Sequence, residues 1–269
     1  MYYDPIKRQT GYFFSCCRWT RVLFYRLLDL LLLRSWYVRR EVRDWARHAV
    51  PGASVLDAGS GFGQYVYFVS RLPGKFFVKG VDVKQDEIDI CERFFGSGPS
   101  KGRISFEKAD LTAFVDPGKH DLVLCVDVLE HIKDDVLVMK NLCESLKPGG
   151  CLIISTPSDL GGSDVHEEGD NSFIGEHVRD GYGVQEITDK LTEAGFSRVE
   201  PQYSYGKYGH RAWLISMKYP IKMLNAGKMF FLAVPMYYLV VFPFAMLLNF
   251  LDLRTGNRSG TGLIVRATR

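Results

Sequence analysis

Strand-like and helix-like segments alternate along the middle of this 269-residue chain, and this alternation restricts its possible folds most strongly. Short apolar runs end at turns, and each is followed by a segment whose apolar residues recur at helical spacing. This pattern is typical of an α/β fold with a mostly parallel sheet and helices on both faces. We expect strands at residues 54–60, 76–83, 104–111, 120–128 and 149–157, and helices at 64–72, 86–96, 134–147 and 184–195.

The first expected strand ends in the glycine-rich stretch VLDAGSGFGQ. Gly59, Gly61 and Gly63 allow sharp turns and close approach of a ligand, and the helix N-terminus that follows favours negative charge. The spacing is G-x-G-x-G, because Gln64 stands where the dinucleotide-binding pattern G-x-G-x-x-G requires glycine. Asp57, just before the glycines, would repel a pyrophosphate but could attract an amino group.

Two further aspartates stand where later strands end. Asp82 closes the second strand, where a carboxylate can accept hydrogen bonds from a ribose diol. Asp110 closes the third strand and could reach an adenine amino group. Each aspartate alone is more often a helix N-cap or a turn residue. Together with Asp57 and the glycine loop, they favour a nucleoside-containing ligand at this edge of the sheet.

With these motifs the chain resembles class I S-adenosylmethionine-dependent methyltransferases, and most closely the small quinone- and lipid-type members in which LEH follows the fourth strand. The resemblance implies a Rossmann-like sheet of seven strands in the order 3-2-1-4-5-7-6, with the seventh strand antiparallel. It also implies S-adenosylmethionine as the cofactor. The matching pieces are VLDAGSGFGQ, VKGVDV, EKADL, HDLVLCVDVLEHI, LKPGGCLIISTP and LTEAGFSRVE, within residues 50–217, and the likeness resumes at 262–269.

The resemblance assigns roles to residues of the expected site. The glycines face the methionine part of the cofactor, Asp82 the ribose and Asp110 the adenine, while Asp127 lies beside the reacting methyl group. The residues that we expect to bind the cofactor are Asp57, Gly59, Ser60, Gly61, Gly63, Gln64, Asp82, Val83, Asp110, Leu111 and Asp127.

A sulfonium is an activated methyl donor, so the protein needs mainly to align the acceptor and exclude water. A general base helps if the acceptor is a phenol, enol or amine. The candidates are Asp127, Glu130 and His131 after the fourth strand, and His166 and His177 after the fifth. The last two lie in a long polar segment typical of a lid, where loop carbonyls could equally satisfy them. Asp127, Glu130 and His131 could hold a divalent cation, but we expect no metal, because Glu130 and His131 more often anchor the next helix.

Residues 229–251 contain no charged side chain and are long enough to cross a bilayer. In the family they fall in an insertion, residues 207–260, between strands six and seven. Both ends of the insertion must then return to one sheet edge, which excludes a single crossing. Pro235 and Pro243 are also expected to break helical hydrogen bonding. A re-entrant hairpin, an in-plane helix pair and a soluble apolar lid remain, and we favour membrane docking.

Residues 1–49 form an expected basic amphipathic helical region, which packs on the domain, lies on a membrane or covers the substrate as a lid. Asp29 and the lack of a small-residue cleavage site argue against a signal peptide. Residues 1–50 carry a net charge of +6 and residues 51–217 one of −9. Basic ends beside apolar segments fit an anionic membrane better than nucleic acid. The six cysteines lack metal spacing and fit a reducing compartment.

We therefore expect a methyltransferase domain, residues 50–206 and 261–269, attached to the inner face of the cytoplasmic membrane. The expected reaction is direct in-line transfer to a hydrophobic lipid, isoprenoid or quinone-like acceptor, with O-methylation favoured. A NAD(P)-dependent oxidoreductase on a similar sheet and a non-catalytic membrane adaptor are the alternatives. The acceptor atom and the oligomeric state stay open.

Overall fold

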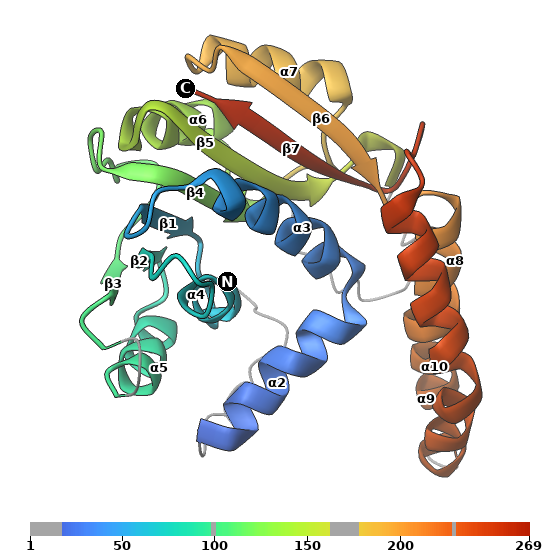
Figure 1. The fold of residues 1–269 in the computed structure, drawn as a ribbon. Helices are drawn as coiled ribbons and strands as arrows, with labels where there is room; N and C mark the ends of the chain where they lie inside the picture. The colour runs from blue at the N-terminus through green and yellow to red at the C-terminus, as the bar shows by residue number, and fades with distance from the viewer. Residues whose placement is uncertain (1–17, 98–100, 162–177, 228–229) are drawn as a thin grey trace.

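The computed structural model describes residues 18–97, 101–161, 178–227 and 230–269. Its centre is a seven-stranded sheet in the order β3-β2-β1-β4-β5-β7-β6, in which β7 runs antiparallel to β5 and β6 (Figure 1). The predicted fold class and strand order are confirmed. The strands are β1 (Ser54–Ala58), β2 (Phe77–Asp82), β3 (Ile104–Lys108), β4 (His120–Val126), β5 (Leu146–Pro157), β6 (Arg198–Ser204) and β7 (Gly262–Thr268).

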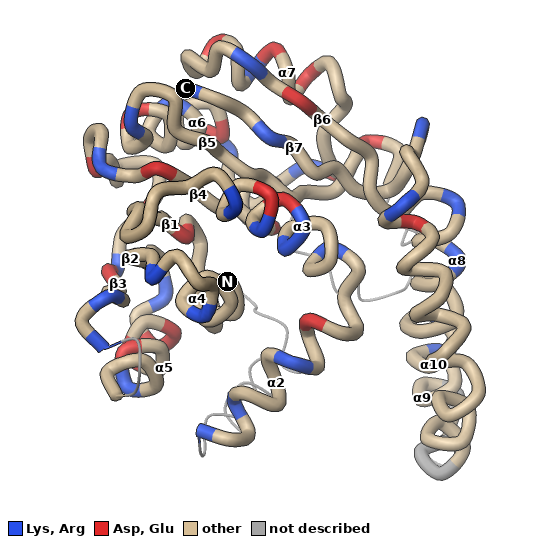
Figure 2. The backbone as a smooth tube through the Cα atoms, viewed as in Figure 1, with Lys and Arg blue, Asp and Glu red and all other residues tan. Residues whose placement is uncertain are grey.

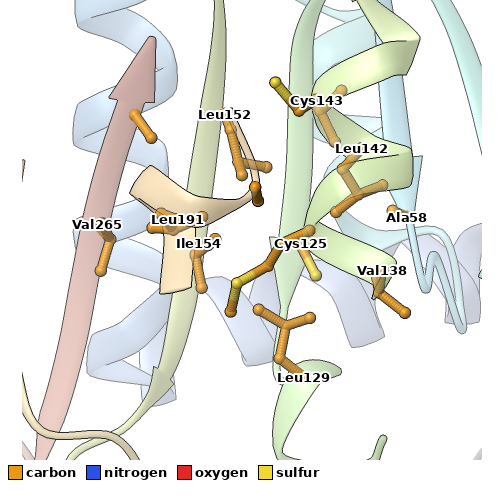
Figure 3. Packing of buried hydrophobic residues seen from close by; sticks show 14 of the residues in the cluster. Ala58, Cys125, Leu129, Val138, Leu142, Cys143, Leu152, Ile154, Leu191 and Val265 are labelled. Carbon is orange, nitrogen blue, oxygen red and sulfur yellow. The ribbon is translucent and has the colours of Figure 1, made fainter. Parts of the chain in front are cut away.

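Helices cover both faces of this sheet, and alternate residues of each central strand enter two separate cores. Val123 and Cys125 of β4 face one core, whereas Leu122 and Leu124 face the other. Figure 3 shows the first core, where Cys125 and side chains of β5 meet side chains of α6 and α7. The helices on the sheet are α3 (Leu33–His48), α4 (Gln64–Ser70), α5 (Gln85–Phe95), α6 (Asp135–Ser145) and α7 (Val184–Glu193).

In the described part of the N-terminal region, from residue 18 onward, lie two helices, α2 (Arg18–Leu31) and α3. They are separated at Leu32, whose backbone is extended with φ −96° and ψ 111°. α3 packs on the sheet and buries Val38, Val42 and Trp45 in the second core. α2 leaves α3 at an angle and extends away from the sheet (Figure 1). The region therefore divides into a core helix and a projecting helix.

The insertion between β6 and β7 is a helical hairpin that also projects from the sheet (Figure 1). Its first arm contains α8 (Lys207–Trp213), a π-helical turn (Leu214–Lys218) and α9 (Tyr219–Ala226), and its second arm is α10 (Phe230–Arg254). We expected Pro235 and Pro243 to break helical hydrogen bonding, and α10 nevertheless continues across both prolines. A proline removes one helical hydrogen bond and bends a helix, but packing against α8 and α9 holds this helix together.

Candidate active site

The glycine loop joins β1 to α4 at the carboxyl edge of the sheet. Gly59, Gly61 and Gly63 have φ angles of +79°, +45° and +74°, a region that residues with a Cβ adopt at a cost. The Gly59 and Ser60 amides donate to the Val81 carbonyl oxygen at 2.8 and 2.9 Å, which fixes the loop against the end of β2. The positive φ angles therefore explain why glycine occupies all three positions.

The three glycines differ in what surrounds them. A Cβ added at Gly59 would lie 2.3 Å from Val128 Cγ2, and one added at Gly63 would lie 3.1 Å from Cys91 Sγ. At Gly61 the same atom would meet no described atom within 4 Å. Close approach of a ligand is therefore a property of Gly61, whereas Gly59 and Gly63 are also required for packing within the protein.

Two buried side-chain oxygen atoms beside the glycine loop lack hydrogen-bond partners among the described residues. Asp57 is 1% exposed, and among the described residues neither its Oδ2 atom nor the buried Ser60 Oγ has a hydrogen-bond partner. Burial, reinforced by the nearby Asp82 carboxylate, raises the pKa of Asp57 to about 7. Buried polar groups are normally paired, so this arrangement fits a ligand with donor groups, such as an ammonium.

The predicted ribose and adenine residues lie at the ends of the next two strands. Asp82 accepts the amide N–H of Gly61 at 2.8 Å and that of Lys84 at 2.9 Å, which orients its carboxylate along the glycine loop. Each carboxylate oxygen keeps a lone pair that a ligand hydroxyl can use. Asp110 is exposed, and one of its oxygens accepts the Thr112 amide at 2.9 Å. Both carboxylates therefore remain able to bind a ligand.

Three other predicted cofactor residues have different surroundings. Val83 is exposed directly after β2, and Leu111 is buried in the first core. The Gln64 amide points towards the N-terminal helices, where its Nε2 donates to Asp29 Oδ1 at 2.9 Å and to Ser35 Oγ at 3.0 Å. Gln64 thus ties α2 and α3 to the start of α4, and its cofactor role stays a prediction.

Asp127 follows β4 and has a φ angle of +52°, which is unusual for a residue with a side chain. Its amide donates to Ser155 O at 2.8 Å, and its carboxylate forms a salt bridge with Arg34 Nη1. The Arg34 amide in turn donates to Tyr205 Oη at 3.1 Å. Sequence reasoning missed Arg34 and Tyr205, because one lies in the N-terminal region and the other follows β6. The only signal for Arg34 was its place in a basic segment.

The candidate bases are only partly described. His131 is exposed at the end of a short 3-10 helix (Leu129–His131), close in sequence to Asp127. Glu130 is buried, its carboxylate accepts Thr156 Oγ1 at 3.3 Å, and burial raises its pKa. Among the described residues, no group of three or more His, Cys, Asp and Glu is arranged to hold a metal ion. The predicted bases His166 and His177 lie outside the described residues.

An open hollow of about 470 Å³ lies on the described surface. It is lined by Lys79, Phe114, Asp116 and Lys119, and it reaches the predicted site only at Asp110. The glycine loop does not border it. We therefore locate the candidate site from the glycine loop and the strand ends, where the unpaired buried groups lie.

Comparison with known proteins relates this region to a family described as a methyltransferase domain, which matches residues 55–150. A ubiquinone biosynthesis O-methyltransferase of Xanthomonas campestris is 31% identical over 111 residues, which cover 41% of this chain and 46% of that protein. Phosphoethanolamine N-methyltransferase 1 of Zea mays is 31% identical over 151 residues, which cover 55% and 29%. The chain thus spans less than half the length of these relatives.

Solved structures support the same fold. Phosphoethanolamine N-methyltransferase 2 of Haemonchus contortus, in complex with S-adenosyl-L-methionine, superimposes with a TM-score of 0.60. The match covers 97% of this chain and 60% of that chain at 17% sequence identity. At this level of identity the similarity concerns the fold and leaves the chemistry to the site residues.

Proposed function

Residues 55–150 belong to the methyltransferase-domain family, and from this premise we propose that the protein transfers the methyl group of S-adenosylmethionine to a hydrophobic, membrane-embedded lipid or quinone-like acceptor. The predicted family, class I S-adenosylmethionine-dependent methyltransferases, is confirmed by the domain match and the sheet order. One observation carries the proposed activity: a buried Asp57 Oδ2 atom without a hydrogen-bond partner among the described residues stands beside a glycine loop whose Gly61 is open to a ligand and donates its amide to Asp82.

The residues present fit this cofactor. Asp57 and the glycine loop would hold the methionine part, whose ammonium matches the buried Asp57 Oδ2 atom that has no partner among the described residues. Asp82 would accept the ribose hydroxyls, and Asp110 would face the adenine amino group. When bound, S-adenosylmethionine supplies an electrophilic methyl group, so the protein's task is to bind, align and desolvate the acceptor.

We place the reacting end of the site at Asp127. Its ion pair with Arg34 sets the charge next to the expected methyl group and holds α3 over the carboxyl end of β4. His131 lies in the same turn after β4 and is the described candidate for a base, while His166 and His177 remain candidates outside the described residues. A proton leaving a phenolic or enolic acceptor would pass to one of these groups.

The hairpin supports a hydrophobic acceptor and membrane docking, because its apolar side chains point outward. Residues Ala233–Arg254 have a mean hydropathy of 1.8, yet only 11% of this apolar helical segment is buried. Met236 is 66% exposed and Leu239 is 71% exposed. Figure 2 shows that α10 carries no charged residue along most of its length. An exposed apolar surface of this size is typical of a protein or membrane interaction site.

Two tyrosine hydroxyls of α10 are paired within the hairpin. Tyr237 Oη donates to Ile215 O at 2.7 Å, and Tyr238 Oη donates to Ser216 O at 2.6 Å. Both acceptors belong to the π-helical turn, whose hydrogen-bond pattern departs from that of an α-helix. In lipid every backbone polar group needs a partner within the protein, so these contacts suit an apolar surrounding.

The base of the hairpin is tied to α3. The buried Asp252 carboxylate accepts Tyr37 Oη and the Gly209 amide, each at 2.8 Å. Asn257 Nδ2 donates to Tyr37 Oη at 2.9 Å. Both ends of the insertion therefore lie at one place beside the sheet, which favours a hairpin that enters and leaves a membrane on the cytoplasmic side.

Methyl transfer tests this proposal directly. Purified protein would be incubated with S-adenosylmethionine carrying a labelled methyl group and with total lipid extract in vesicles. The matched control replaces residues 214–246 by a short Gly/Ser bridge, which removes the outer hairpin and keeps the contact of Asp252 with Gly209. We expect labelled lipid with the full chain and at least about tenfold less with the control, at equal affinity for S-adenosylhomocysteine.

The same measurements separate the alternatives. Affinity for NAD(P) in place of S-adenosylhomocysteine would favour the oxidoreductase. Cofactor binding without label in any lipid fraction would favour the adaptor or a water-soluble acceptor. Mass spectrometry of lipids from cells with and without the gene would then identify the methylated product.

A further inference from the structure

The projecting helix α2 packs Tyr25, Val22 and Phe24 against the second core and also exposes large apolar side chains on its other side. Its most buried residues are Arg21 and Tyr25. Its exposed residues include Trp19, which is 84% exposed, and Leu23, which is 53% exposed. The apolar stripe of α2, defined by spacings of four, four and three residues, consists of Trp19, Leu23, Leu27 and Leu30.

The opposite face of α2 holds the glycine loop of the candidate cofactor site. Arg21 Nη2 donates to Phe62 O at 2.7 Å, and Tyr25 Oη donates to the same oxygen at 2.5 Å. Phe62 lies between Gly61 and Gly63, so both donors fix the middle of the loop. Tyr25 is also fully buried. α2 therefore contacts the loop through one face and presents apolar side chains on the other.

We infer that the apolar stripe of α2 is a second membrane contact, and that its docking on an anionic bilayer stabilises the glycine loop and strengthens cofactor binding. This inference rests on the proposed membrane function of the hairpin. A bilayer fits as the occupant because α2 and the hairpin, although inclined to each other, both extend to the lower side of the sheet in Figure 1, so that one surface can contact both. Arg26 is exposed beside the stripe and suits an anionic head group.

The coupling follows from the geometry of the helix. Bilayer contact through the stripe and loop contact through Arg21 and Tyr25 use opposite faces, so α2 makes both contacts at once. The extended residue Leu32 joins α2 to α3. The position of α2 therefore depends on its contacts with the glycine loop and with the bilayer. If lipid stabilises the position of α2 that holds the glycine loop, lipid raises the affinity for the cofactor. By linkage, the cofactor must then raise the affinity for lipid by the same factor.

Calorimetry of the full-length protein tests the inference. Affinity for S-adenosylhomocysteine would be measured with and without vesicles of phosphatidylcholine and phosphatidylglycerol, alongside cosedimentation with the same vesicles. We expect vesicles to raise the affinity about fivefold or more. The double variant Leu23→Ser, Leu27→Ser should lose this gain and still cosediment through the hairpin. The matched control Leu137→Ser, at an exposed leucine of α6, should keep it.

The opposite face of α2 provides a second test. Tyr25→Phe removes one donor to Phe62 O and leaves the stripe intact, so the vesicle-dependent gain should shrink while cosedimentation stays unchanged. The variant Leu239→Ser, Val240→Ser on the hairpin should instead weaken cosedimentation itself.

Each contrary result has a distinct meaning. Cosedimentation of the wild type without any gain in affinity would overturn the coupling and leave the proposed function standing. A full gain in the Leu23→Ser, Leu27→Ser variant would show that the stripe is not the docking surface. If the wild type were a dimer in analytical ultracentrifugation and this variant a monomer, a second copy would cover the stripe. Failure of the wild type to cosediment would overturn the proposed membrane function itself.

Discussion

Arg34, at the start of α3, forms a salt bridge with Asp127 at the end of β4, although the two residues are 93 positions apart in the sequence. Asp127 has a left-handed backbone conformation, which its contacts with Arg34 and Ser155 help to maintain. Backbone strain of this kind concentrates at functional sites. The N-terminal region therefore contributes directly to the charge and geometry of the candidate site.

If Arg34 and Asp127 act as one unit, their effects on turnover will not add. We expect Arg34→Met and Asp127→Asn each to lower kcat/KM by about tenfold or more, and the double variant to lose little beyond the worse single variant. Arg47→Met, which removes an exposed arginine of the same helix, is the control and should retain activity. Multiplicative losses in the double variant would mean that the two residues act independently.

Asp82 is expected to contribute most to ribose recognition. Asp82→Ala removes the acceptor for two ribose hydroxyls and also the partner of the Gly61 amide. Binding of S-adenosylhomocysteine should weaken by about 2–4 kcal/mol, as measured by calorimetry. Asp89→Ala, at an exposed aspartate of α5, should bind normally. Unchanged affinity in a folded Asp82→Ala protein would remove the ribose assignment.

Gly59 and Gly61 should respond differently to the same substitution. Gly61→Val would put a side chain into open space, so the protein should stay folded and lose cofactor binding, with about 1–2 kcal/mol of backbone strain. Gly59→Val would collide with Val128 and should lower the melting temperature much further. Thermal melts and calorimetry on both variants check this. Equal melting temperatures would show that Gly59 is not packed as the structure has it.

Burial of Asp57 predicts a stability that falls as pH rises. The folded-state pKa is raised to about 7, so the folded protein binds a proton that the unfolded chain has already released at lower pH. Between pH 5 and pH 8 the wild type should therefore lose up to about 3 kcal/mol relative to Asp57→Asn, which cannot titrate there. Urea unfolding at both pH values measures this difference. If the difference in unfolding free energy between the wild type and Asp57→Asn did not change with pH, the raised pKa of Asp57 would be contradicted.

The sequence specified the sheet well and the site incompletely. Apolar runs and glycine turns located the strands, and the family resemblance supplied their order, because local patterns cannot order strands. Asp57, Asp82 and Asp110 could be predicted to lie at one edge because the ends of parallel strands share it, and their cofactor roles stay predictions. Arg34 was missed because a salt bridge across the fold leaves no local pattern, and any basic residue of the N-terminal region was an equal candidate.

Two features of the helical regions could not be predicted from the sequence. The break at Leu32 was missed because no glycine or proline marks it, and apolar leucines continue on both sides. The prolines of α10 were expected to break helical hydrogen bonding, but sequence alone does not reveal that α8 and α9 pack along this helix, which continues across both prolines. In both regions local helix propensity was the only guide from the sequence, whereas tertiary packing determines where each helix breaks or continues.

The last prediction concerns the depth of the hairpin in a membrane. Its first arm carries Lys218 and Lys222, the latter exposed near the tip, while the exposed side of α10 is apolar. Burying these ammonium groups in hydrocarbon is costly, so we expect the hairpin to lie shallowly, with α10 towards the lipid and the lysines towards the head groups. Single cysteines at Lys222 and Arg258, in a variant otherwise free of cysteine, report this in sealed inner-membrane vesicles of known orientation. Both should react with an impermeant reagent from the cytoplasmic face. Reaction of Lys222→Cys from the opposite face only would mean that the hairpin crosses the bilayer.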